Sequence, residues 1–215
     1  MKGRSSAVRG LYVLCDDDPR WPHDPVEQAR AALAGGARVV QLRAKRATDA
    51  QALAWAEAIR ALAQAHGALC FVNDRFDLAL AAGADGVHLG QTDLPPARLP
   101  APARARLLVG RSTHTLDEAR AAQREDVDYV AFGPLFGTTS KDSEYDARGL
   151  DALAEVVRIA APRPVVAIGG IDAARAAGVV RAGAAAVCVI SAVAGEPDPE
   201  AAARALSQVV DGARA

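Results

Sequence analysis

Lysine is scarce in this sequence, and two of the three lysines follow apolar segments. Of the 25 basic residues (Lys plus Arg), only Lys2, Lys45 and Lys141 are lysines. A compact ammonium group suits contact with a phosphate oxygen. The occurrence of Lys45 in "QLRAK" and of Lys141 in "TTSK" therefore indicates phosphate binding. The alternative is that both are ordinary solvated lysines in loops.

Two aspartates end successive apolar segments. Asp74 closes "FVND" and Asp93 closes "VHLGQTD". On adjacent strands, about 5 Å apart, the two carboxylates would lie on one side of a sheet or barrel. Such a pair suits Mg²⁺, whose remaining positions are filled by water and substrate phosphate. The alternative is that both aspartates cap the helices that follow. An acid and base pair has less support, because nothing in the sequence explains a raised pKa.

Glycine and serine mark a second group of candidate anion-binding positions. "AIGGI" contains Gly169 and Gly170, whose backbone N–H groups can approach an anion, and "VISAV" places Ile190 and Ser191 at the start of the last helix. Ser112, in "GRSTHT", is either a helix cap or a further phosphate donor. The alternative for this group is structural: tight turns at the glycines and an N-cap at Ser191.

The histidines do not form a recognisable nucleophile site. His88 and His114 lie near the ends of apolar segments, whereas His23 and His66 lie in segments expected to be connecting or helical. The sequence has no HExxH motif and no Ser/His/Asp or Cys/His arrangement typical of a protein nucleophile. Hydrolysis through a protein nucleophile is therefore not indicated.

A repeated pattern predicts the elements that must position these residues. The segments "AGGARVVQLR", "AAGADGVHLG" and "RAGAAAVCVI" each join an alanine-rich helix end, a glycine cap and a β-rich run, and "EDVDYVAFG" is a weaker copy. Four further apolar runs alternate with them: "GLYVLCD", "GALCFVND", "RLLVGRS" and "RPVVAIGG". Asp24 and Thr115 are expected helix N-caps.

Eight strands that alternate with helices predict a (β/α)8 TIM barrel, a single domain over residues 1–215. The active site of such a barrel lies at the C-terminal ends of its strands, where the polar residues described above would converge. The alternative is a doubly wound open sheet, but its glycine-rich turn after the first strand is absent.

Composition limits the class of partner. Apolar residues make up 51% of the chain and aromatic residues only 4%, which suits strands covered by helices. With a net charge of −1 and no basic tract, neither nucleic acid nor a membrane surface is an expected partner. Cys15, Cys70 and Cys188 lie far apart in apolar runs, as expected for reduced core thiols of a cytoplasmic protein.

Six motifs in this order resemble one family. "QLRAK", "VNDRFDLALAAGADGVHLGQTD", "GRSTHT", "GPLFGTTSK", "VVAIGGI" and "VISAV" together resemble thiamine-phosphate synthase. The resemblance implies a (β/α)8 barrel and a transferase. This enzyme joins 4-amino-2-methyl-5-hydroxymethylpyrimidine diphosphate to 4-methyl-5-(2-phosphooxyethyl)thiazole and releases pyrophosphate. In the implied mechanism diphosphate leaves first, and the thiazole nitrogen captures the resulting pyrimidine methylene cation.

The resemblance also implies roles for individual residues. Asp74 and Asp93 match the Mg²⁺ ligands. The cations that would stabilise the departing diphosphate are Arg43, Lys45 and Lys141. The pyrimidine diphosphate would be held by Gln41, Arg43, Lys45, Asn73, Ser112 and Lys141, with His88 beside the pyrimidine. The thiazole phosphate and its surroundings would be contacted by Thr138, Ser140, Gly170, Ile190 and Ser191. No role is implied for the acidic segment 142–146.

Two other functions fit the same barrel. A thiazole tautomerase binds a thiazole phosphate without coupling it, and it is expected to have a histidine after the glycine that ends the sixth strand and to lack the third-strand aspartate. This sequence has Pro134 and Asp74 at those positions. The second alternative is a non-catalytic barrel that binds thiamine precursors, which the retained acids, lysines and hydroxyls disfavour. The sequence leaves the oligomeric state open, a homo-oligomer included.

Overall fold

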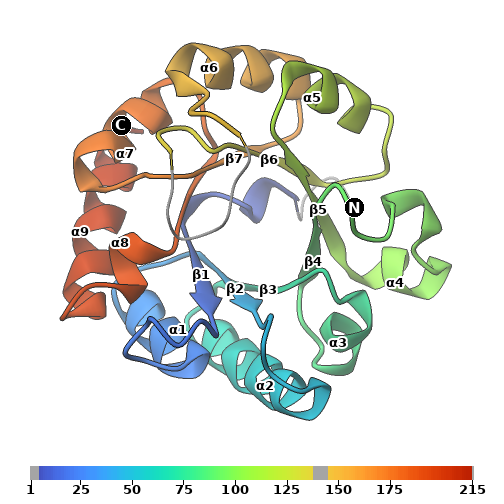
Figure 1. Ribbon diagram of the computed structural model, residues 1–215, viewed down its shortest axis with the longest axis vertical. Helices are drawn as coiled ribbons and strands as arrows, with labels where there is room; N and C mark the ends of the chain where they lie inside the picture. Colours follow the sequence, from blue (N-terminus) through green and yellow to red (C-terminus); the bar gives the residue numbers. More distant parts are fainter. Residues whose placement is uncertain (1–4, 138–144, 215) are drawn as a thin grey trace.

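Eight parallel strands form a closed barrel surrounded by helices (Figure 1). The computed structural model describes residues 5–137 and 145–214. The strands pair in sequence order, and β1 closes the ring against β8. Their bounds are β1 Gly10–Asp16, β2 Val39–Arg43, β3 Leu69–Asn73, β4 Gly86–Leu89, β5 Leu108–Thr113, β6 Tyr129–Phe132, β7 Val165–Ile168 and β8 Ala186–Val189. The predicted (β/α)8 barrel is confirmed.

The helices form the outer layer, and two of them begin at the N-caps that the sequence predicts. Asp24 accepts from the backbone N–H groups of Val26 and Glu27, and Thr115 accepts from that of Glu118. The α-helices are α1 Pro25–Ala34, α2 Asp49–Ala65, α3 Phe76–Ala81, α4 Ala101–Arg106, α5 Leu116–Ala122, α6 Gly149–Ala160, α7 Ala173–Arg181, α8 Ser191–Ala194 and α9 Pro199–Gly212. Two short 3₁₀ helices are η1 Ser5–Ala7 and η2 Pro96–Arg98. Within the described residues, no helix is both long and apolar enough to cross a membrane.

The prediction for Ser191 needs a correction. Ser191 begins α8, which has only four residues, and the last helix is α9. Gly195 caps α8, and the "GEPDP" segment that follows interrupts the helix because proline cannot continue the backbone hydrogen bonds. Ser191 is also not an N-cap, since Ile190 occupies that position without a side-chain bond.

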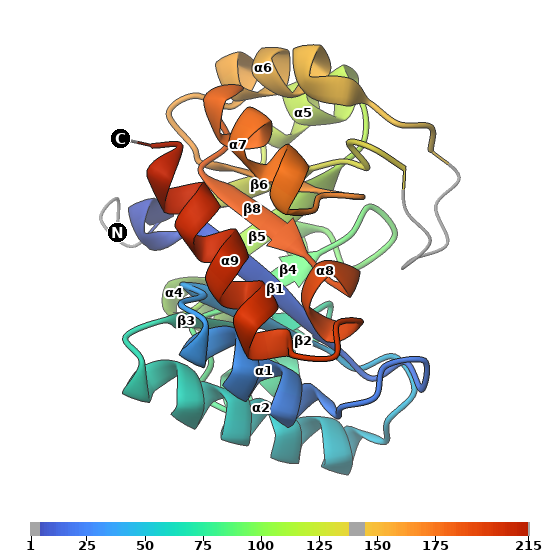
Figure 2. The same cartoon turned by 90° about the vertical axis from the view of Figure 1, so that its left-hand side faces the viewer.

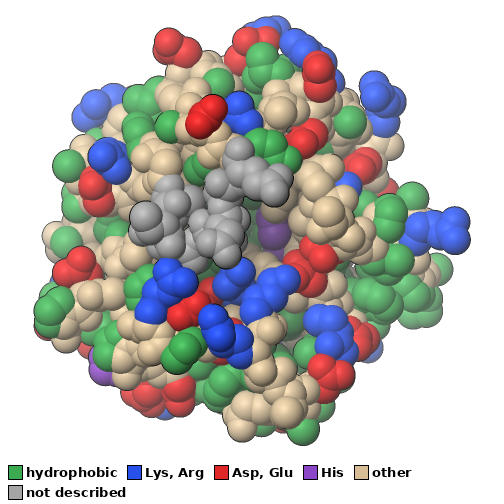
Figure 3. All heavy atoms as spheres, viewed as in Figure 1, with side chains coloured by type: hydrophobic (Ala, Val, Ile, Leu, Met, Phe, Trp, Pro, Cys, Tyr) green, Lys and Arg blue, Asp and Glu red, His purple; other side chains and the backbone are tan. Residues whose placement is uncertain are grey.

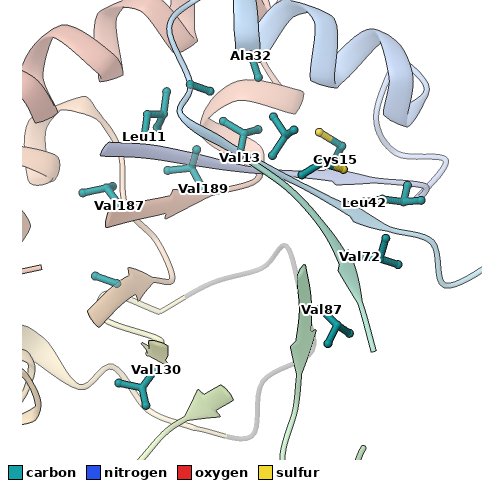
Figure 4. Packing of buried hydrophobic residues seen from close by; sticks show 14 of the residues in the cluster. Leu11, Val13, Cys15, Ala32, Leu42, Val72, Val87, Val130, Val187 and Val189 are labelled. Carbon is teal, nitrogen blue, oxygen red and sulfur yellow. The ribbon is translucent and has the colours of Figure 1, made fainter. Parts of the chain in front are cut away.

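Strand side chains alternate between the helix layer and the barrel interior. On β1, Leu11, Val13 and Cys15 join the core beneath the helices (Figure 4), whereas Tyr12 and Leu14 join a separate cluster inside the barrel. Burying one such aliphatic side chain contributes roughly 1.5–3 kcal/mol. Cys15, Cys70 and Cys188 are buried and are not joined in disulfides, as the sequence predicts.

Aromatic rings fill the middle of the barrel and require glycines beside them. Phe71 packs edge-on against Tyr129, with ring centroids 5.5 Å apart. A Cβ atom on Gly86 would lie 2.3 Å from the Phe71 ring, and one on Gly110 would lie 2.2 Å from Tyr129. The two glycines of β4 and β5 therefore make room for the rings of β3 and β6.

Gly110→Ala is expected to lower the free energy of unfolding by roughly 1–3 kcal/mol, the usual cost of overpacking a core. The added methyl group would meet Tyr129 at 2.2 Å and the Nδ1 atom of His88 at 2.5 Å. Urea unfolding followed by circular dichroism measures the loss. Gly212→Ala is the control, because a Cβ atom there has nothing within 4 Å. Equal stability of the Gly110 variant and the parent would contradict the prediction.

A side view shows at which end of the barrel the C-terminal ends of the strands lie. In Figure 2 the arrowheads of β1 and β8 point to the side of the molecule on which α8 begins. Because all strands are parallel, their C-terminal ends meet on this side. The polar segments that follow the strands are therefore gathered around one opening.

Candidate active site

A cavity of about 680 Å³ opens at the C-terminal end of the barrel. Figure 3 views this end, and a histidine lies in the central hollow. Seven of the residues predicted from the sequence line the cavity: Gln41, His88, Ser112, Gly169, Gly170, Ile190 and Ser191. Five others are not among its lining residues: Arg43, Lys45, Asn73, Asp74 and Asp93. Thr138, Ser140 and Lys141 lie outside the described residues. The cavity thus brings together predicted residues from both proposed substrate sites.

One wall of the cavity is a chain of hydrogen-bonded side chains. Gln41 is 2% exposed, accepts from the hydroxyl of Tyr12 at 2.6 Å and donates to Asn73 Oδ1 at 2.7 Å. His88 contacts Tyr129 through Nδ1 at 2.8 Å and Ser112 through Nε2 at 2.9 Å. Ser112 is therefore bonded to a histidine and does not cap a helix.

Asp74 has an unusual backbone conformation. Its φ is 63°, the one positive value at a non-glycine residue within residues 5–137 and 145–214. Aspartate tolerates this left-handed region better than most residues, and such strain is common at functional sites. The backbone N–H of Asp74 donates to the carbonyl of His88 at 2.8 Å, which holds β3 and β4 together at the turn.

Asp74 and Asp93 lie together beside the cavity, as the strand-end argument predicts. Burial raises the pKa of the Asp74 carboxyl and the adjacent Asp93 carboxyl raises it further, whereas Lys45 lowers it. Neither aspartate caps a helix: Arg75 is the N-cap of α3, and the Asp93 carboxylate accepts from the backbone N–H of Gly90 at 2.7 Å. The structure therefore excludes the capping alternative.

The donor set fits Mg²⁺ better than a metal that needs an all-protein shell. No group of three or more His, Cys, Asp or Glu side chains suited to a metal occurs in the part of the chain that the structure describes. Two adjacent carboxylates, Asp74 and Asp93, repel each other unless a proton or a cation lies between them. Mg²⁺ commonly binds one or two carboxylates and completes its shell with water and substrate phosphate.

Two basic side chains extend from the end of β2 toward the acids. Arg43 pairs with Asp16 at 2.5 Å, and Lys45 pairs with Asp74 Oδ2 at 2.5 Å. Figure 3 shows basic side chains gathered beside the hollow, with acidic ones between them. Asp17 accepts from the backbone N–H groups of Lys45, Arg46 and Ala47, so its carboxylate fixes the loop that carries Lys45.

The turns after β7 and β8 form another part of the cavity wall, where small residues expose the backbone. Gly169 and Gly170 both have positive φ, 102° and 63°. A Cβ atom on Gly170 would lie 2.2 Å from the carbonyl oxygen of Gly137. Glycine is therefore needed at this turn, which lines the cavity together with Ile190 and Ser191.

Comparison with known proteins assigns the family. A family model described as thiamine monophosphate synthase matches residues 11–193. The chain belongs to the thiamine monophosphate synthase family. The thiamine-phosphate synthase of Anaeromyxobacter dehalogenans (strain 2CP-C) is 53% identical over 99% of this chain and 93% of its own length. That of Methanoculleus marisnigri is 47% identical over 95% of this chain and 97% of its own length.

A solved structure of the same family supports this assignment. Thiamine phosphate pyrophosphorylase from Pyrococcus furiosus superposes with a TM-score of 0.88 at 35% identity, over 99% of this chain and all of that chain. Membership of the thiamine monophosphate synthase family, which the six motifs predict, is therefore confirmed.

Sequence reasoning missed three features of this thiamine monophosphate synthase family member. The buried tyrosines Tyr12 and Tyr129 were not selected, although they connect predicted site residues. Asp16 and Asp17 were also missed, although both are acids directly at a strand end, the signal that identified Asp74. Tyr145 stacks on His114 with centroids 4.3 Å apart and an angle of 12°, and no sequence pattern predicted this pair.

Proposed function

We propose that this chain couples 4-amino-2-methyl-5-hydroxymethylpyrimidine diphosphate to 4-methyl-5-(2-phosphooxyethyl)thiazole, giving thiamine phosphate and pyrophosphate. One observation carries the proposal: a single cavity has an amide and histidine wall on one side and glycine turns on the other. Acids and cations, among them Asp74 and Lys45, lie outside the cavity lining next to the first side. The first side suits a pyrimidine and its diphosphate, and the second suits a phosphate held by backbone N–H groups.

In this proposal Asp74 and Asp93 would hold Mg²⁺, which would supply positive charge beside the diphosphate. Arg43 and Lys45 bind phosphate oxygens directly and stabilise the negative charge that develops as the diphosphate departs. Their present partners, Asp16 and Asp74, keep both side chains at the opening before substrate binds. Lys141 has the same proposed role, although it lies outside the described residues.

The other proposed task of the chain is to position two rings and exclude water. Holding the thiazole nitrogen beside the reacting methylene group replaces an encounter in solution with a step within one complex. Apolar lining residues, among them Leu14, Val166 and Ile168, keep water from the methylene cation. The aminopyrimidine itself stabilises that cation, so no protein nucleophile is needed.

The proposal treats small molecules as the partners of this protein and the cytoplasm as its location. Three buried cysteines that are not joined in disulfides fit a reducing compartment. A net charge of −1 gives no electrostatic reason to bind nucleic acid.

Gly170→Ala is expected to raise the KM for the thiazole phosphate by about tenfold or more, equivalent to roughly 1.4 kcal/mol of binding free energy. The new Cβ atom would lie 2.2 Å from the Gly137 carbonyl oxygen and push the two turns apart. Steady-state kinetics with each substrate varied in turn measure the change.

Gly67→Ala is the matched control, because Gly67 has a φ of 65° and a Cβ atom there would have nothing within 4 Å. Both variants force alanine into a left-handed conformation, but only Gly170 lies at the cavity. An equal rise in KM in both variants would mean that backbone strain alone causes the effect.

The direct test mixes purified protein with both substrates and Mg²⁺, with EDTA in a parallel reaction. Thiamine phosphate is quantified by oxidation to fluorescent thiochrome. Metal-dependent product supports the proposed reaction and the metal together. Folded protein that binds the thiazole phosphate but gives no product would instead favour a tautomerase or a non-catalytic binding barrel.

A further inference from the structure

Six side chains from six different strands form one continuous hydrogen-bonded chain across the barrel. In order these are Asn73, Gln41, Tyr12, Tyr129, His88 and Ser112. The two hydroxyls in the middle are 3.1 Å apart. Tyr12 is 1% exposed and Tyr129 is fully buried, so bulk water has little access to either side chain. We call this set the polar relay.

Strand register and one glycine make the relay geometrically feasible. Gly110 pairs with His88 on one side and with Tyr129 on the other. Because Gly110 has no side chain, the Tyr129 ring passes over β5 and reaches His88 on β4. The two rings lie 5.5 Å apart in a stacked arrangement.

The orientation of the Gln41 amide, together with the number of available protons, sets the direction of the relay. A tyrosine hydroxyl carries one hydrogen, and Tyr12 uses its hydrogen on Gln41 Oε1. Tyr129 must therefore donate to Tyr12, and its oxygen must accept from His88 Nδ1. In a neutral imidazole Nε2 is then an acceptor, so Ser112 donates to it.

Burial keeps both tyrosines in the protonated form that this direction requires. Loss of hydration raises the pKa of Tyr12 and of Tyr129, because the phenolate would have to exist without water. Reversing any one bond would leave two donors or two acceptors facing each other. Only two arrangements are therefore self-consistent, in which all six members donate in one direction or all donate in the other, and the Gln41 amide oxygen that faces Tyr12 selects the one described above.

We propose that Tyr12 and Tyr129 are positioning residues that transmit one hydrogen-bond direction across the barrel, holding His88 as its Nδ1–H tautomer and orienting Gln41 and Asn73. The ends of the relay then differ. Ser112 presents acceptor lone pairs, and the amide groups of Gln41 and Asn73 present N–H donors. This pattern complements a ring with an exocyclic amino group and an acceptor nitrogen, such as an aminopyrimidine. A 4-oxo ring requires the opposite pattern.

The choice of ligand rests on the proposed function, whereas the direction of the relay does not. The first test therefore uses ligand-free protein labelled with ¹⁵N-histidine at pH 8. His88 is assigned from the resonances that disappear in His88→Gln. The expected result is a protonated Nδ1 and an unprotonated Nε2. An Nε2–H tautomer or an imidazolium at His88 would overturn the proposal, whatever reaction the protein catalyses.

Tyrosine variants test whether the hydroxyls set this tautomer. In Tyr129→Phe the Nδ1–H group loses its acceptor, so the Nε2–H form that donates to Ser112 is expected to appear. Phe71→Leu is the control, because Phe71 packs against both tyrosine rings without a hydroxyl. It is expected to lower stability but to keep the Nδ1–H tautomer. A tautomer change in Phe71→Leu equal to that in Tyr129→Phe would overturn the role of the hydroxyls.

Substrate discrimination gives the functional readout. The parent is expected to prefer the 4-amino pyrimidine diphosphate to its 4-oxo analogue by about 10²-fold or more in kcat/KM. In Tyr12→Phe the Gln41 amide is free to turn, and this preference is expected to fall about tenfold. If Tyr12→Phe lowers kcat for both rings equally and keeps the preference, Tyr12 is only structural and the proposal fails.

Discussion

Asp93→Asn is expected to lower kcat/KM by about 10²-fold or more, since stabilisation of charge in the transition state is usually the largest catalytic effect. Asparagine keeps an oxygen that can accept from the Gly90 N–H group, so the loop after β4 should stay in place. It loses the negative charge that, next to Asp74, would bind Mg²⁺. The variant should therefore remain folded and bind the metal weakly.

Two measurements separate metal binding from a general loss of activity. Mn²⁺ binding followed by electron paramagnetic resonance reports the site without turnover, and a Mg²⁺ titration of the thiochrome assay reports the activity. Asp117→Asn is the control, since this α5 carboxylate is 91% exposed and pairs with Arg120. Parent-like kcat/KM and metal affinity in Asp93→Asn would refute the metal assignment.

Lys45→Ala is the second change expected to have a large effect, again about 10²-fold in kcat/KM. Lys45 lies 2.5 Å from Asp74, at the place where the metal and the diphosphate would meet. Its loop is held by backbone bonds to Asp17, which truncation of the side chain leaves intact. The loss should therefore come from the missing ammonium group and leave the path of the chain unchanged.

The adjacent residue provides a matched control. Arg46 lies in the same loop, is 63% exposed and pairs with Asp18 away from Asp74. Arg46→Ala should retain nearly full activity, and Lys45→Arg should restore only part of it, because a planar guanidinium does not replace a compact ammonium. If Arg46→Ala and Lys45→Ala were equally impaired, the effect would come from general positive charge at the opening.

Much of the architecture could be predicted because it depends on local patterns. The alanine-rich helices, their caps at Asp24 and Thr115, and the eight apolar runs are short-range signals that tertiary contacts did not override. The helix after the last strand was predicted incorrectly, because it is divided in two. "GEPDP" divides the expected final helix into α8 and α9, so Ser191 opens a single turn instead of the last helix.

The candidate site could be predicted wherever a polar residue lies at the C-terminal end of a strand or in the loop that follows it. Asp74, Asp93, Arg43 and Lys45 obey this rule, because all C-terminal strand ends of a parallel barrel meet at one opening. This rule does not decide between two roles that the same residue type can have. Capping and metal binding both suit an aspartate, and only the position of Arg75 at the start of α3 excludes capping by Asp74.

The sequence by itself determined the barrel, the family and the acids and cations at its opening, since composition, strand ends and motif order are properties of the chain alone. Only the tertiary structure decided which residues lie inside the barrel. Strands of a parallel barrel are apolar on both faces, so alternation does not distinguish Tyr12 from Leu11. The register of each strand with its neighbours sets which of its side chains point into the barrel. The contact between Tyr12 and Tyr129 there joins residues 117 positions apart.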